Sequence, residues 1–324
     1  MDRRTFIGTV AGGILASTPA VRAQQARVYR VGVVLYGGPY AGAVDGLRRG
    51  LAELGLEEGK QLILHVRDGK GDLKAVEEAA AGLEREKVDL IFAVASTVAD
   101  AVKRTTKTVP IVFYAGTDPV AAGLVESFHK PGGRLTGIYG RLADLTAKRL
   151  DLLRDMVPGL RRVVTFSNSD SPDYLQRMKA MREAARLLKV ELIERPVTSV
   201  EELRAALRAL RAGEADAYLS STAGMVVSQS ELVIDTMKAK KLPSMFSELD
   251  SVVKGGLAGY GVSYDAMGRL AAKYVHRILL SANPGELPVE QVDRLYFVIN
   301  LKTAKDLGLT IPQSLLLRAD EVIQ

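Results

Sequence analysis

Short apolar runs alternate with amphipathic helical segments along most of this 324-residue chain. In the first half, the stripe of Val44, Leu47, Leu51 and Leu54 is typical of the helices. Repeated strand–helix–strand units predict parallel strands with right-handed crossovers. The expected strands are 28–35, 62–66, 90–94 and 111–114, and the expected helices are 43–54, 73–86 and 96–103.

The same alternation begins again in the second half of the chain. Helices are expected at 145–156, 172–188, 200–211 and 226–240, and strands at 162–166, 191–194, 217–219 and 243–246. This is more chain than one hydrophobic core usually holds, so we expect two α/β lobes. The segment 136–139 is expected to cross between the lobes.

The remaining segments are too few for a third domain. They comprise a strand at 257–262, a helix at 266–280, a strand at 296–300 and a helix at 302–307. We expect them to add to the existing sheets. The expected boundaries are 28–137 with 264–285 for the first lobe and 138–263 with 286–324 for the second. Repeated crossing would give a hinge of several strands.

Composition excludes some classes of function. The chain has no cysteine, which rules out thiol catalysis and cysteine-ligated metals. Its formal charge of +6 is small for its length, and the basic residues are interleaved with acids on the helices. We therefore expect no nucleic-acid partner.

The first residues are typical of an export signal. Arg3 and Arg4 precede an apolar, small-residue run from 6 to 20, and Val21-Arg22-Ala23 resembles a cleavage site. The paired arginines are also similar to a twin-arginine signal. We expect residues 1–23 to be removed and the mature protein to be periplasmic.

Polar side chains follow the expected strands. Thr117 and Asp118 come directly after the apolar strand at 111–114, within the stretch Val109–Ser127. They either cap the next segment or contact a ligand, because ligands of open α/β sheets bind beyond the carboxyl ends of the strands. Hydroxyls and helix amino termini at these ends suit a small polar or carboxylate ligand. The candidates at strand ends are Tyr36, Tyr40, Ser96, Thr97, Thr117, Asp118, Ser167, Asn168, Ser169, Ser221, Thr222, Ser247 and Glu248.

Catalytic patterns are not found at these positions. His65, His129 and His276 fall within a strand, a loop and a helix, so neither a serine–histidine arrangement nor a metal cluster is indicated. Pro39 stands where a dinucleotide-binding loop would need its second glycine. We expect no enzyme activity, no cofactor and no metal.

Four segments resemble one family. They are 115–120 (AGTDPV), 246–248 (FSE), 257–264 (LAGYGVSY) and 298–312 (VINLKTAKDLGLTIP). They are similar to the substrate-binding proteins of ABC transporters related to the tryptophan/phenylalanine-binding type, with a type I periplasmic binding fold. The resemblance implies two Rossmann-like lobes that close on a solute at the hinge, and delivery to a membrane permease. We expect a monomer.

The chain also departs from that family pattern. The family often has Gly-Thr-Pro where this chain has Ala95-Ser96-Thr97, and Asn-Pro-Ser-Glu at 167–170, where this chain has SNSD. After the third strand of the second lobe, where the family pattern has a polar Thr-Asp-Asn, this chain has Thr222-Ala223-Gly224. Ala223 removes an acid, and a buried ammonium needs carboxylate partners. Glu248, Asp170 and Asp118 are the acids that would replace it.

We therefore interpret the chain as an extracytoplasmic solute-binding protein of an ABC importer. Its solute would be a small organic molecule, carboxylate-bearing, aromatic or amino-acid-like. Tyr36, Tyr40, Tyr139 and Tyr264 would form aromatic walls, although Tyr139 and Tyr264 equally suit hinge packing. The alternatives are a ligand sensor with the same fold and, less favoured, an α/β enzyme.

Cell fractionation tests the export signal. Because residues 1–23 have basic, apolar and small-residue regions in order, the mature protein is expected to begin at or near Gln24, outside the cytoplasmic membrane. Amino-terminal sequencing of the periplasmic fraction measures this. Full-length protein confined to the cytosol would contradict it.

Overall fold

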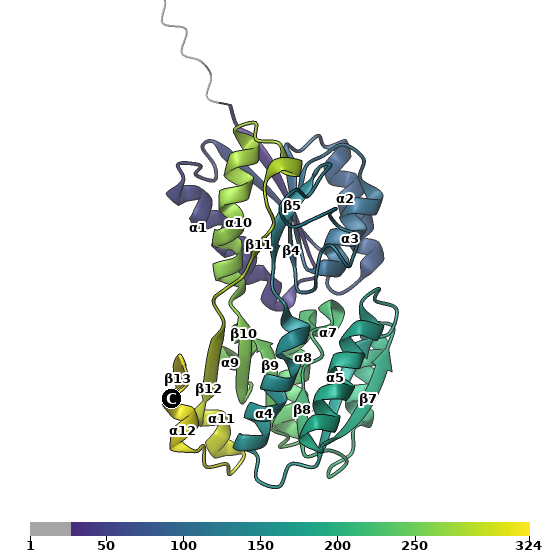
Figure 1. The fold of residues 1–324 in the computed structure, drawn as a ribbon, viewed down its shortest axis with the longest axis vertical. Coiled ribbons are helices and arrows are strands. Elements are labelled where there is room, and N and C mark those ends of the chain that lie inside the picture. The colour runs from purple at the N-terminus through teal and green to yellow at the C-terminus, as the bar shows by residue number, and fades with distance from the viewer. Residues whose placement is uncertain (1–26) are drawn as a thin grey trace, which may run out of the picture.

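A computed structural model describes residues 27–324 and shows two α/β lobes stacked along the long axis (Figure 1). The expected export signal lies outside these residues. The fold class expected from the sequence is confirmed, with two mainly parallel sheets. None of the helices in the described part is long and apolar enough to cross a membrane.

The first lobe contains a six-stranded sheet in the order β11-β5-β4-β3-β1-β2, with every neighbouring pair parallel. Helices α1 and α10 cover one face, and α2 and α3 cover the other (Figure 1). The strands are β1 (Tyr29–Leu35), β2 (Leu62–Asp68), β3 (Leu90–Val94), β4 (Ile111–Ala115), β5 (Leu135–Tyr139) and β11 (Glu290–Gln291). The helices are η1 (Gly38–Tyr40), α1 (Ala41–Glu53), α2 (Leu73–Arg85), α3 (Ser96–Thr105), α10 (Tyr264–Leu279) and η3 (Pro284–Glu286).

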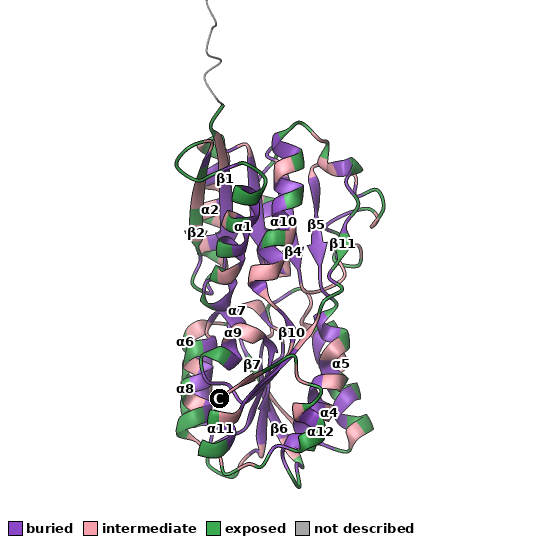
Figure 2. Ribbon diagram, turned by 90° about the vertical axis from the view of Figure 1, so that its left-hand side faces the viewer, coloured by how far each residue is buried: buried purple, intermediate pink, exposed green. Residues whose placement is uncertain are grey.

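The second lobe contains a seven-stranded sheet in the order β13-β12-β10-β9-β8-β6-β7, in which β10 and β12 are antiparallel. Helices α4 and α5 lie on one face, and α6 and α8 on the other (Figure 2). The strands are β6 (Arg162–Asn168), β7 (Glu191–Val197), β8 (Ala217–Leu219), β9 (Ser244–Glu248), β10 (Ala258–Val262), β12 (Tyr296–Asn300) and β13 (Glu321–Ile323). The helices are η2 (Leu142–Leu145), α4 (Thr146–Met156), α5 (Tyr174–Leu188), α6 (Val200–Ala209), α7 (Gly224–Ser228), α8 (Ser230–Ala239), α9 (Leu249–Val253), α11 (Leu301–Asp306) and α12 (Gln313–Leu316).

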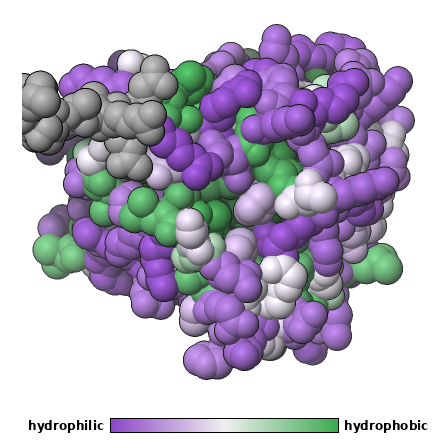
Figure 3. Space-filling model, turned by 90° about the horizontal axis from the view of Figure 1, so that it is seen from above, coloured by the Kyte–Doolittle hydropathy of each residue, from purple (hydrophilic) through white to green (hydrophobic). Residues whose placement is uncertain are grey.

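Burial explains why the central strands are apolar throughout. Every residue of β3, β4 and β5 is buried, because helices cover both faces of the sheet (Figure 2). One apolar core surrounds the first sheet, and two lie on the faces of the second. The outer end of the first lobe is largely hydrophilic with a band of apolar residues across it (Figure 3).

Two expected elements differ from the structure. The segment 136–139, expected as a crossing, belongs to β5 and pairs with β4 as the fifth parallel strand. The helix expected at 226–240 is divided into α7 and α8 at Gln229, whose backbone is not helical. Periodicity did not reveal the break because apolar residues stand on both sides of it, at 225–227 and 232–234.

Three segments connect the lobes: one from β5 to η2, one from β10 to α10, and one from β11 to β12. The expected lobe boundaries fell at 137 and 285. Strand pairing extends the first sheet to Tyr139 and to Gln291, because β11 pairs with β5. This arrangement is the multi-strand hinge of the expected fold.

Candidate functional site: the cleft between the lobes

The carboxyl ends of the strands of both sheets meet between the lobes. Three adjoining cavities lie there, each lined by residues from both lobes. We call them the deep cavity (about 20 Å³), the side cavity (about 100 Å³) and the outer groove (about 890 Å³). Thr97, at the start of α3, lines all three. A cleft in this place is where α/β sheets bind ligands.

The deep cavity brings together the largest share of the candidate residues. Its candidates from the first lobe are Tyr40, Ser96, Thr97, Thr117 and Tyr264, and those from the second are Thr222 and Ser247. Two other candidates, Tyr36 and Asn168, line the outer groove. The volume of the deep cavity is that of about one water molecule.

Ser96 and Thr117 form a linked pair of hydroxyls at the first-lobe wall. Ser96 Oγ accepts from the Gly116 amide at 3.0 Å and from Thr117 Oγ1 at 3.0 Å. Because both lone pairs of Ser96 are used, its own O–H is available to donate into the cavity. Ser96 also begins α3, whose free amides favour an anion. This wall therefore suits a carboxylate.

Aromatic rings form the hinge side of the deep cavity. The Tyr40 and Tyr264 rings lie 4.7 Å apart between centroids, and the Tyr114 ring meets Tyr264 edge-on at 5.8 Å. Burial raises the pKa of each of these phenols, so all three remain neutral hydroxyls at neutral pH.

The other candidates line none of the three cavities. Asp118 Oδ1 accepts from the amides of Val120 at 2.8 Å and Ala121 at 3.0 Å, which is a capping contact. Tyr139 donates to Gln291 Oε1 at the edge of the first sheet. The remaining candidates are held within the second lobe: Ser167 beside Arg177, Ser169 beside Val197, and Ser221 against the Phe166 carbonyl.

Glu248 is buried behind the deep cavity wall. One carboxyl oxygen accepts from Ser247 Oγ at 2.5 Å and the other from Ser251 Oγ at 2.6 Å. Desolvation by burial raises the pKa of Glu248. The side chain is therefore occupied by its own neighbours, and it orients Ser247 toward the cleft.

Among the residues that line the deep cavity, sequence reasoning missed two with polar side chains, Tyr114 and Asp173. Tyr114 was assigned to the apolar end of a strand. Asp173 was placed within an expected helix, whereas it precedes α5 and forms an ion pair with Arg177 at 2.6 Å. The spacing of Asp173 and Arg177, four residues apart, was the available signal.

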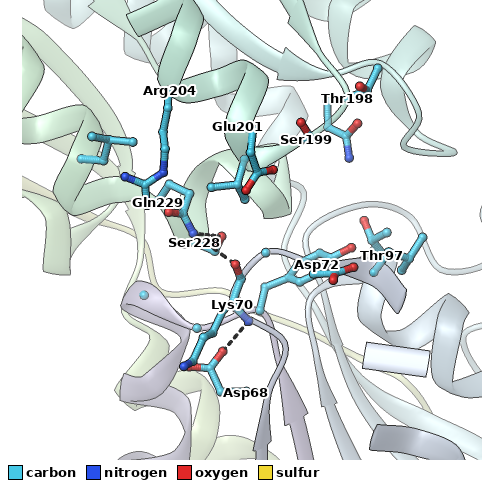
Figure 4. A pocket seen from close by; sticks show the side chains of 18 of the residues that line it. Asp68, Lys70, Asp72, Thr97, Thr198, Ser199, Glu201, Arg204, Ser228 and Gln229 are labelled. Atoms are coloured by element: carbon cyan, nitrogen blue, oxygen red, sulfur yellow. Dashed lines mark hydrogen bonds between the residues drawn. The ribbon is translucent and has the colours of Figure 1, made fainter. Parts of the chain in front are cut away.

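The outer groove is polar and lies between the lobes. Figure 4 shows that Glu201 and Arg204 extend into it from the second lobe and face Asp68 and Asp72 of the first. The Gln229 side-chain amide crosses the groove and donates to the Lys70 carbonyl at 3.4 Å. The described residues contain no group of three or more metal-ligating side chains.

The fold and cleft define a class, the two-lobed α/β binding proteins of type I periplasmic architecture. Residues 31–323 match the profile of the family described as ABC transporter substrate binding protein, and the chain belongs to this family.

Individual relatives support this assignment. A tyrosine-binding protein from Clostridioides difficile is 28% identical over 267 residues, covering 82% of this chain and 76% of that protein. The structure of a conserved domain protein from Vibrio cholerae is 28% identical, with a TM-score of 0.83, and covers 91% of this chain and 100% of that one. An ABC domain from Streptococcus pneumoniae in complex with L-Trp is 25% identical, with a TM-score of 0.82 and the same coverage.

Ala95 adopts a backbone conformation that normally requires glycine. It follows β3 with φ 111° and ψ 150°, and it lines the deep cavity. Such strain costs about 1–3 kcal/mol, and glycine loses about 0.5–1 kcal/mol more backbone entropy than alanine.

Ala95→Gly is therefore expected to raise the free energy of unfolding by about 1 kcal/mol. Urea denaturation measures the change. Ala101→Gly, within the helical part of α3, is the control and should lower stability by about 1 kcal/mol. A loss of stability in Ala95→Gly would show that the backbone of Ala95 is not strained.

Gly38 marks a close contact between the lobes. A Cβ at Gly38 would lie 2.4 Å from the Ser228 carbonyl oxygen of α7, across the cleft. Gly59 provides a matched control, because its φ is also positive, at 83° against 60° for Gly38, but no atom lies within 4 Å of an added Cβ.

Both alanine substitutions should lower stability by about 1–2 kcal/mol through backbone strain. Only Gly38→Ala should also weaken solute binding, because the added methyl group separates the lobes. Calorimetric titration with small-angle scattering measures affinity and lobe separation. Equal affinities in the two variants would show that this contact does not affect closure.

Proposed function

We propose that the protein is an extracytoplasmic solute-binding protein of an ABC importer, which captures an aromatic amino-acid-like solute bearing a carboxylate and delivers it to a membrane permease. It acts by binding, with no catalytic step. The observation that carries the proposal is the deep cavity, where hydroxyls from both lobes converge beside tyrosine rings.

The relatives support the class of solute. One is described as a tyrosine-binding protein and another was solved in complex with L-Trp. The Ser96 O–H, left free because Ser96 Oγ accepts from Thr117, would donate to the carboxylate, and the rings of Tyr40 and Tyr264 would contact the apolar part.

Lobe movement is part of the proposal. Pockets for small organic molecules are usually about 300–1,000 Å³, whereas the deep cavity has about 20 Å³. A solute reaches these hydroxyls only when the lobes separate. Rotation about the three connecting segments would open the cleft, and contacts to the solute from both sides would stabilise closure.

Thr117→Ala tests the binding site. Without the Thr117 hydroxyl, the Ser96 O–H is no longer directed to the carboxylate. Losing a hydrogen bond to a buried ligand group costs about 1–3 kcal/mol, so affinity for L-tyrosine or L-tryptophan should fall roughly ten- to hundredfold. Asp118→Ala is the control. The Asp118 carboxylate is engaged in the cap, so this variant should lose about 1 kcal/mol of stability and keep its affinity.

Isothermal titration calorimetry beside a denaturant melt separates the two effects. Unchanged affinity in Thr117→Ala would place the solute against a different wall. No binding of aromatic amino acids or aromatic carboxylic acids to the wild type, measured also as the absence of a thermal shift, would overturn the proposed class of solute.

A further inference from the structure

Asp173 is the acid that borders both inner cavities. Among residues 27–324, no other Asp or Glu lines the deep cavity and the side cavity together. Asp100 lines only the side cavity, where it pairs with Arg104. The Asp173 side chain is 18% exposed, so part of its carboxylate faces the cleft.

Arg177 holds this carboxylate in place. Its side chain is 2% exposed, and Nη1 lies 2.6 Å from Asp173 Oδ2. A guanidinium buried this deeply needs an anionic partner. Ser171 Oγ donates to the other carboxylate oxygen, Oδ1. An ionised carboxylate accepts about four hydrogen bonds, so acceptor positions remain beyond those used by Arg177 and Ser171.

The opposite wall carries hydrogen-bond donors. Ser96 and Thr97 line both inner cavities with Asp173, and Thr117 donates to Ser96. Donors on the first lobe and an acceptor on the second are complementary to a molecule that carries a carboxylate and an ammonium close together. An α-amino acid has both groups on one carbon.

The other acids considered for this role are engaged elsewhere. Glu248 is hydrogen-bonded to Ser247 and Ser251, and Asp118 caps the turn after β4. Asp170 lines the outer groove and neither inner cavity. Ala223 has no polar side chain. Asp173, immediately before α5, is the acid among these that borders the inner cavities.

We propose that Asp173, oriented by Arg177, accepts the ammonium group of the solute, so that the protein selects zwitterionic amino acids over the corresponding plain carboxylic acids. This inference rests on the proposed function and adds its specificity-determining residue.

The test compares Asp173→Asn with Asp151→Asn by isothermal titration calorimetry. Asp151 also pairs with an arginine, Arg154 of α4, and lines none of the three cavities. The probes are L-tyrosine, 3-(4-hydroxyphenyl)propanoate, which lacks the amino group, and tyramine, which lacks the carboxylate. The matching indole series uses L-tryptophan, indole-3-propanoate and tryptamine.

Wild-type protein should bind the amino acid most tightly. Asp173→Asn should bind the amino acid and the amine roughly ten- to hundredfold more weakly and leave binding of the propanoate unchanged. Asp151→Asn should match the wild type with every probe.

Each contrary result has a separate meaning. An equal loss with all probes in Asp173→Asn would show that Asp173 only supports the wall, and would overturn the inference. Unchanged amino-acid affinity in Asp173→Asn would overturn it as well. Both results leave the proposed function standing. If the wild type binds the propanoate as tightly as the amino acid, the inference is overturned and the proposed function stands. Wild-type protein that binds no probe of either series would overturn the proposed function and this inference with it.

A second variant covers a failure to fold. Asp173→Asn leaves the buried Arg177 without its counter-ion, which can unfold the lobe. The double variant Asp173→Asn/Arg177→Met removes both charges and replaces the guanidinium with an apolar chain. It should give the same selective loss, and a uniform loss with all probes would overturn the inference.

Discussion

The cleft depends on one constraint, that parallel strands covered on both faces by helices must all end at the same edge of the sheet. In the first lobe, β1, β3 and β4 are parallel neighbours, so the segments after them meet at one edge. In the second lobe, β6, β8 and β9 are likewise parallel neighbours, so the segments after them also meet at one edge. With the two edges facing each other, short polar segments far apart in the chain become the walls of one site.

Burial determines how the charged groups of this site act. Arg177 lies beneath the second-lobe wall and forms an ion pair with Asp173. Arg149 is fully buried at the hinge, where it donates to the Leu142 carbonyl, and desolvation lowers its pKa to about 10. A buried ion pair contributes little net stability. The Arg177–Asp173 pair instead holds the Asp173 carboxylate in a fixed orientation.

Local strain also concentrates at the cleft. Ala95 and Thr222 have positive φ values of 111° and 63°, and both line the deep cavity. Each follows a short buried strand, where the chain must turn sharply for the next helix to begin. The surrounding sheet and helices hold these residues in conformations that they would otherwise avoid.

The sequence by itself determined the lobes, the order of most strands and helices, and the edge at which ligand contacts would lie, because apolar periodicity and strand-end polarity are local properties. It identified Ser96, Thr97 and Thr117 as cleft residues, which the structure brings together in the deep cavity. Only the tertiary structure decided which polar residues face the cleft and which satisfy their own neighbours. Glu248 was expected at a strand end and Asp173 within a helix, yet Glu248 is enclosed by two serines and Asp173 borders both inner cavities. That difference depends on side chains from other strands and helices, which no local pattern specifies.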